Sequence, residues 1–235
     1  MRKGMNAAKA LAMIALLAGM VLGAYGADEA KKDAKDLAPL ELQLPKPIFI
    51  GTPKNVTPSP HLEMPSAKPR EPFLAPKGTI NLAKGKTVTS STKDPLTGEL
   101  AMLTDDDKAG TDGTFVELDR GLQWAQIDLG QPAQIYAIVI WHFHSDVGRI
   151  YHDVIVQVSD DPDFIKDVKT VYNNDYDNTA GMGIGKDKEY FESYEGRLID
   201  AHGVKGRYVR CYSNGNTSNE ENHYVEVAVY GKPAK

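Results

Sequence analysis

Short runs in which apolar and polar residues alternate recur through the second half of the chain. The clearest run is 224–230, where Val225, Val227 and Val229 share one face of an extended backbone. A period of two that is rich in valine and tyrosine is typical of half-buried β-strands. The same pattern predicts strands over 86–91, 124–129, 135–141, 154–159, 168–172 and 207–212.

Turn-forming residues separate these runs at irregular intervals, and no long apolar stripe of helical period lies between them. We expect residues 200–206 to form one of the connecting turns. Several short strands without alternating helices predict an all-β chain folded as an antiparallel β-sandwich. The folded unit is expected to span residues 79–233, which is the size of one ordinary domain.

The N-terminal residues follow a different pattern. Arg2 and Lys3 precede an apolar run over 10–22, and the small residues of 24–26 follow it. Such a run is too short and wrongly flanked to cross a membrane, and it predicts a secretory signal peptide over residues 1–26. No cysteine stands where a lipoprotein would carry one, so we expect a secreted or periplasmic protein without a lipid anchor.

Proline dominates the stretch that follows. Ten of the chain's 14 prolines lie between residues 28 and 77. They are spaced too closely for helices or central strands, because proline lacks the backbone N–H and fixes φ. We therefore predict that residues 27–78 form an extended, largely disordered linker.

Charge narrows the classes of partner. The full chain has a formal net charge of −5, and residues 78–235 carry 16 Lys and Arg against 25 Asp and Glu, which gives −9. An acidic domain repels phosphate groups, so nucleic acid and anionic membranes are not expected partners. The single cysteine, Cys211, excludes an intramolecular disulfide, and its place in a predicted strand indicates a buried thiol.

Two groups of residues carry candidate chemistry. Asp105, Asp106 and Asp107 crowd three carboxylates together, which favours either a solvated turn or a calcium site, although the spacing of an EF-hand is absent. His142 and His144 stand two residues apart on one strand face. That pair is compatible with recognition of sugar hydroxyls, with a structural role in a half-buried strand, or with a transition metal that would need a third ligand.

Six short segments occur in a recognisable order, among them QWAQIDLG at 123–130 and EVAVYG at 226–231. The others lie at 81–86, 103–107, 156–161 and 207–210. Together they resemble the discoidin family, the coagulation factor five/eight type C domains, and are most similar in style to bacterial carbohydrate-binding modules of the galactose-binding-like fold. The resemblance covers residues 79–232 and implies a jelly-roll β-sandwich in which the two ends of the domain meet.

Many members of that family hold a structural calcium between an acidic loop and a glutamate of the last strand. The resemblance implies that Asp105, Asp107 and Glu226 would be its ligands, with Thr111 as a fourth. Asp106 departs from the pattern, because the family usually has glycine at this position. Calcium is therefore the cofactor that we expect.

Ligands of such modules bind at loops on one end of the sandwich, commonly through His, Arg and Asn beside an aromatic ring. The residues in comparable places are Trp141, His142, His144, Arg149, Asn214, Asn216 and Asn219. The resemblance implies an exported, non-catalytic module that binds carbohydrate or a glycoconjugate.

Two other functions stay open. The chain could be a structural or protein-interaction module of the cell envelope without a sugar site, or a metal-dependent enzyme built on His142 and His144. Relatives that bind phosphatidylserine use exposed apolar spikes beside basic residues. The loops here show no such basic spike, so membrane lipid is not an expected partner.

Overall fold

The computed structural model describes residues 36–47, 57–66, 68–145 and 148–234. The predicted signal peptide and part of the predicted linker lie outside these residues. The described residues divide into two compact units, one of residues 36–40 with 73–77 and the other of the described residues within 41–72 and 78–234. Within the described residues, no helix is long and apolar enough to cross a membrane.

The smaller unit contains one pair of short strands. β1 (Leu37–Pro39) and β2 (Leu74–Pro76) are antiparallel, with Ala38 opposite Ala75. Two further backbone hydrogen bonds extend the pair, from Leu40 N to Phe73 O and from Lys77 N to Asp36 O, each 2.7 Å long.

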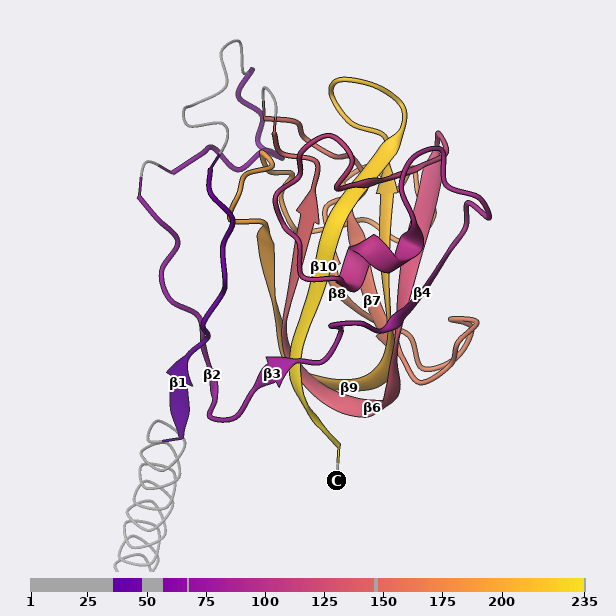
Figure 1. Cartoon of the computed structure of the whole chain (residues 1–235). Helices are drawn as coiled ribbons and strands as arrows, with labels where there is room; N and C mark the ends of the chain where they lie inside the picture. The colour runs from indigo at the N-terminus through magenta and orange to yellow at the C-terminus, as the bar shows by residue number, and fades with distance from the viewer. Residues whose placement is uncertain (1–35, 48–56, 67, 146–147, 235) are drawn as a thin grey trace, which may run out of the picture. The chain divides into compact units, whose positions relative to one another are not determined.

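The larger unit is an antiparallel β-sandwich (Figure 1), and the predicted all-β class is confirmed. Its main strand order is β3-β10-β6-β9-β7-β8, with β4 paired to β6 and β5 paired to β10. The elements are β3 (Ile80–Asn81), β4 (Thr87–Ser90), the 3-10 helix η1 (Leu100–Thr104), β5 (Val116–Leu118), β6 (Leu122–His142), β7 (Ile155–Ser159), β8 (Lys169–Asn173), β9 (Arg197–Asn214) and β10 (Asn222–Pro233).

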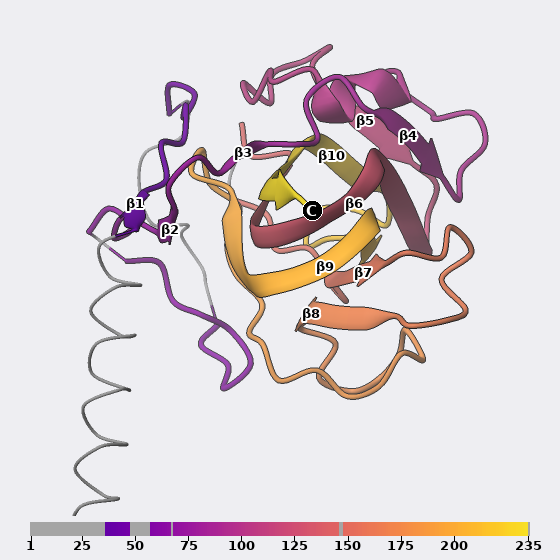
Figure 2. The ribbon, with the colours of Figure 1, turned by 90° about the horizontal axis from the view of Figure 1, so that it is seen from below.

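Two long strands connect the layers of the sandwich. β6 and β9 pair along nearly their whole length and bend together at the end of the domain that is lowest in Figure 1 and faces the viewer in Figure 2. The ladder shifts register between Asp128 and Ala133, and Gly130 in this stretch has φ +84°, which glycine adopts without strain. The turn predicted over 200–206 is wrong, because these residues lie within β9, and the strands predicted over 124–129 and 135–141 are one strand.

β10 is buried on both faces, which corrects the prediction of a half-buried strand. Val227 and Val229 belong to the main hydrophobic core. Glu226, on the opposite face, is also fully buried, because the loop after η1 covers it. Cys211 is buried in the same core as predicted, and burial raises the pKa of its thiol to about 12.

Part of the predicted linker lies against the sandwich. Leu62 is buried and forms a parallel bridge to Glu189. Arg70 donates to the carbonyls of Glu195 and Gly196 at 2.9 and 2.8 Å. The proline pattern did not predict these contacts, which depend on the apolar Leu62 and on the reach of the Arg70 side chain.

Candidate functional site at the loop end

The predicted histidine pair is buried at the end of β6. His142 Nδ1 is hydrogen-bonded to Glu192 Oε1 at 2.6 Å, and the His142 ring stacks on Tyr151 with ring centroids 4.3 Å apart. His144 Nε2 donates to the carbonyl of Lys108 at 2.9 Å. The two histidines therefore have separate interior partners, and neither lies at the surface where a sugar would bind.

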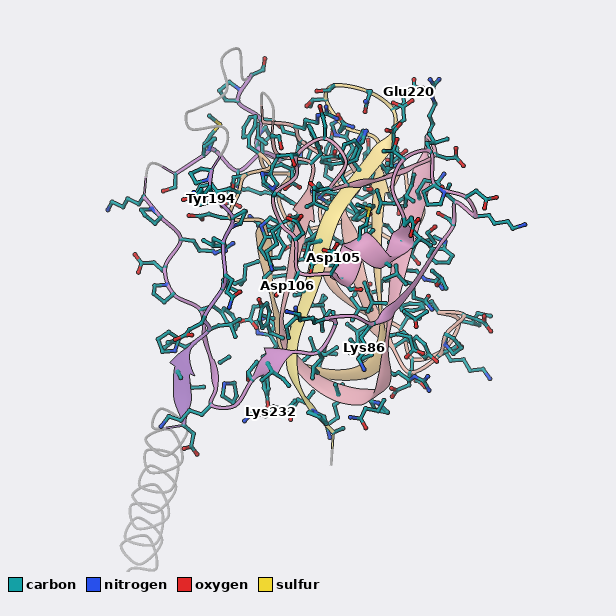
Figure 3. All side chains as sticks on the ribbon, in the orientation of Figure 1. Lys86, Asp105, Asp106, Tyr194, Glu220 and Lys232 are labelled. Atoms are coloured by element: carbon teal, nitrogen blue, oxygen red, sulfur yellow. The ribbon has the colours of Figure 1, made fainter. Side chains whose placement is uncertain are left out.

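Trp141, the predicted aromatic platform, is also fully buried. Its Nε1 donates to the carbonyl of Tyr194 at 3.0 Å (Tyr194 is labelled in Figure 3). Gly196 approaches the same ring so closely that an added Cβ would lie 2.6 Å from it. The Trp141 ring thus packs inside the domain and offers no exposed face for stacking.

Arg149 belongs to a polar and aromatic cluster. Its guanidinium lies 4.7 Å from the centroid of the Phe143 ring, and its Nη1 lies 3.5 Å from His223 Nδ1. His223 Nε2 lies 3.8 Å from Glu117 Oε2. The Phe115 ring meets the rings of Phe143 and His223 at centroid distances of 5.0 and 5.6 Å. We call these five residues the loop-end cluster.

The loop-end cluster joins segments that are far apart in the sequence: β5, the segment after β6, the loop before β7, and β10. Arg149, Phe115 and Glu117 are half-buried, so part of each remains open to solvent. Arg149 was the only one of the five named from the sequence. The sequence pattern did not reveal β5, because this strand has only three residues and too few alternations of apolar and polar positions.

The three predicted asparagines form hydrogen bonds with other residues of the chain. Asn214 Nδ2 donates to Asp153 Oδ2 at 2.7 Å, and Asn216 Nδ2 donates to Asn219 Oδ1 at 2.6 Å. Asn216 is buried, whereas Asn219 is exposed. Asn216 and Asn219 therefore close the turn between β9 and β10, whose outer end is marked by Glu220 in Figure 3.

The acidic loop, which we define as residues 104–111, meets the last strand as the resemblance implied. Asp106 N donates to Glu226 Oε2 at 3.2 Å, and Figure 3 shows Asp105 and Asp106 beside β10. Burial raises the pKa of Glu226 to about 8, although the Asp106 N–H and the charge of Lys108 act in the opposite direction. Glu226 Oε1 is buried without a hydrogen-bond partner.

The other predicted calcium ligands bond within the loop itself. Asp105 Oδ1 accepts from Asp107 N at 2.8 Å, and Asp107 Oδ1 accepts from Ala109 N at 2.9 Å. The hydroxyl of Thr111 lies 3.4 Å from that of Thr114. Asp105, Asp107 and Thr111 are exposed, and the carboxylates of Asp105, Asp107 and Glu226 do not form a group whose ligand atoms all lie within 4.8 Å of one another. As arranged, these residues do not fit a calcium ion.

Three other carboxylates lie close together in the structure. Among the described residues, the one group of three acidic, histidine or cysteine side chains whose ligand atoms lie within 4.8 Å of one another is Asp153, Asp175 and Asp177. We call it the aspartate triad. Asp175 and Asp177 lie in the polar run 173–178, and nothing in the sequence pattern connects that run with Asp153.

Part of the chain is similar to a known protein family. Residues 104–211 match the family model of the F5/F8 type C domains described as the NedA-like, galactose-binding domain. This part of the chain is therefore similar to the F5/F8 type C domains. The resemblance inferred from the six motifs is thereby confirmed, and with it the galactose-binding-like fold. No curated protein sequence matches the chain.

Three similar solved structures are a family 89 glycoside hydrolase from Clostridium perfringens, a chitosan-binding module of a Paenibacillus chitosanase/glucanase and a fucose-binding module from Streptococcus pneumoniae. Their identities to this chain are 17, 20 and 19%, with TM-scores of 0.49, 0.46 and 0.45. The matches cover 66, 65 and 64% of this chain. They cover 99 and 97% of the two modules and 15% of the hydrolase.

Proposed function

We propose that this protein is an exported, non-catalytic module that binds carbohydrate through the loop-end cluster. The observation that carries the proposal is the convergence of Arg149, Glu117 and His223 beside the Phe115 ring. A sugar ring presents hydroxyl groups that both donate and accept hydrogen bonds, together with an apolar C–H face. The loop-end cluster offers a fixed donor, an acceptor and an aromatic ring within one partly exposed surface.

The position of the cluster supports the same proposal. It lies on loops and strand ends that a rigid sandwich holds in place, which is where binding residues concentrate. The family model that matches the chain is described as a galactose-binding domain. The histidine pair supports no catalytic metal, because His142 and His144 have separate partners and neither belongs to the metal-ligand group found among the described residues.

Binding is tested by a glycan array followed by isothermal titration of the sugars that bind. Arg149→Ala is expected to weaken binding by about tenfold or more, because a lost hydrogen bond from a charged group costs about 1.5–3 kcal/mol. Glu117→Gln is expected to weaken binding less, since the amide oxygen still accepts a hydrogen bond.

Export is tested separately, by the mass of the mature chain recovered from its host. Cleavage is expected near residue 26.

Arg207→Ala is the matched control. Arg207 is likewise a half-buried arginine, but its Nε lies 2.7 Å from Asp128 Oδ1, near the bend of β6 and β9. Its removal should leave sugar affinity unchanged. The proposal fails if no glycan binds, or if Arg149→Ala and Arg207→Ala bind sugar equally well. An envelope protein-interaction module would then be the better hypothesis.

A further inference from the structure

Four backbone carbonyl oxygens of the acidic loop already accept hydrogen bonds from donors of the protein. Calcium takes six to eight oxygen ligands, and in loops of this kind several are backbone carbonyls. Here four successive hydrogen bonds use such oxygens: Gly85 N to Thr104 O at 2.7 Å, Lys108 Nζ to Asp106 O at 3.0 Å, His144 Nε2 to Lys108 O at 2.9 Å, and Ser145 Oγ to Gly110 O. Each of these four oxygens therefore has one lone pair already engaged by a donor of the protein.

Lys108 is the unusual residue among the donors. Only 4% of its surface is exposed, and lysine is almost never buried this deeply unless its charge is paired. Its Nζ forms an ion pair with Asp106 Oδ1 in addition to the bond to the Asp106 carbonyl. The ammonium also lies 5.5 Å from the centroid of the Trp141 ring, a distance at which a cation is attracted to an aromatic face.

Asp106 links this ammonium to the last strand. Its carboxylate binds Lys108 Nζ, while its backbone N–H donates to the buried Glu226. Asp106 has φ +77°, a conformation that aspartate tolerates better than most residues, and this allows both contacts from one residue. Lys84 binds the other oxygen of the same carboxylate from the solvent side, at 2.8 Å.

We infer that the Lys108 ammonium is an internal cation that holds Asp106 in place, so that the Asp106 N–H bonds to Glu226 of β10, in the role that the family resemblance gave to calcium. The acidic loop then meets β10 without a metal ion. Lysine at position 108 and aspartate at position 106 act as a pair, because the aspartate that replaces the family's glycine supplies the carboxylate that the ammonium binds. This inference concerns the stability of the sandwich and is independent of sugar binding.

Thermal melts of the purified protein, with chelator and with excess calcium, test the inference. We expect the same Tm in both. A calcium site filled at a hundredfold excess over its Kd would raise Tm by about 5 °C or more in a domain of this size. If calcium does raise Tm, the melt is repeated with Glu226→Gln. Loss of the shift would place calcium at the acidic loop and overturn the inference, whereas a retained shift would place it elsewhere.

Lys108→Met keeps most of the aliphatic stem and removes the charge. It is expected to lower Tm by about 5 °C or more, because it leaves the Asp106 carboxylate without its buried partner. Lys86→Met, an exposed lysine near the same loop (Figure 3), should leave Tm unchanged. A Lys108→Met variant that melts like the wild type would overturn the inference. If that variant does not fold, the calcium melts of the unaltered protein still decide.

Discussion

Two acidic clusters in the sandwich handle the repulsion between carboxylates in different ways. In the acidic loop, the carboxylate of Asp106 is paired with two lysines, Lys84 and Lys108. In the aspartate triad, the hydrogen-bond donors are neutral: the Thr179 hydroxyl reaches Asp153 and Asp177, each at 2.9 Å, and Asn214 donates to Asp153. The first cluster is neutralised by ion pairs, whereas the second is held together by polar groups without charge.

The contrast shows that adjacency in sequence and proximity in space are separate properties. Asp105 and Asp107 are near neighbours along the chain, yet each bonds to the backbone of its own turn. The triad takes Asp153 from before β7 and the other two from after β8, and the tertiary fold brings their ligand atoms within 4.8 Å. A crowded acidic run in the sequence therefore does not by itself indicate a metal site.

The largest effect is expected from Asp175, which is fully buried in the triad. Its carboxylate accepts from Thr179 N at 3.0 Å and from Ala180 N at 2.9 Å. Asp175→Ala should lower the free energy of unfolding by about 2–3 kcal/mol, because both amides lose their acceptor. Urea denaturation measures this change.

Two further variants make that result specific. Asp105→Ala removes an exposed acceptor of one amide and should cost about 1 kcal/mol or less. Asp175→Asn keeps one acceptor oxygen and removes a charge that its two neighbours repel, so it should cost less than Asp175→Ala. An Asp175→Asn variant as unstable as Asp175→Ala would show that the negative charge itself is needed, and the contrast between the clusters would then be wrong.

A smaller effect is expected from Thr179, whose hydroxyl bridges the triad. Thr179→Val keeps the shape of the side chain and removes both bonds, so it should lower the free energy of unfolding by about 1 kcal/mol. Thr179→Ser retains the hydroxyl and is the matched control. Equal stability of Thr179→Val and Thr179→Ser would mean that the hydroxyl does not hold the carboxylates together.

The smallest effect is expected from His152, whose contribution to Tm should depend on pH. The hydrogen bond from His152 Nδ1 to Glu189 Oε1, at 2.7 Å, raises the pKa of His152 above its usual 6.5, and the nearby Asp153 adds to this shift. A histidine whose pKa is raised in the folded state adds stability below pH 6.5, and loses it as the pH rises through the folded value. His152→Gln should therefore lower Tm more at pH 5.5 than at pH 8.5.

The control for that comparison is His202→Gln, at a side chain that is 83% exposed. It should change Tm equally little at both pH values, because water screens an exposed pair. If the difference between wild type and His152→Gln does not depend on pH, the pair contributes no charge-dependent stability. The aspartate triad would then have no nearby cation that affects its stability, in contrast to the acidic loop with its two lysines.

The local pattern was sufficient for the fold class. Predicted strands at 154–159, 168–172 and 207–212 all overlap observed strands, because alternation of valine and tyrosine with polar residues records the period of an extended chain. The pattern missed the continuity of β6 and β9, since glycine and polar residues at a bend look like a turn when no partner strand is visible. It also missed β5, which is too short to show a period.

The sequence by itself determined the strand-rich sandwich, the family motifs and the acidic charge, and the resemblance to a known family implied the place of the acidic loop beside the last strand. Only the tertiary structure decided which side chains face solvent: it buries Trp141, His142 and His144, and it leaves Arg149 partly exposed. The tertiary structure also brought Lys108 to Asp106 and gathered the aspartate triad. The physical reason is that a strand period reports only which side of a backbone a residue occupies, whereas burial and pairing depend on what other segments pack against that side.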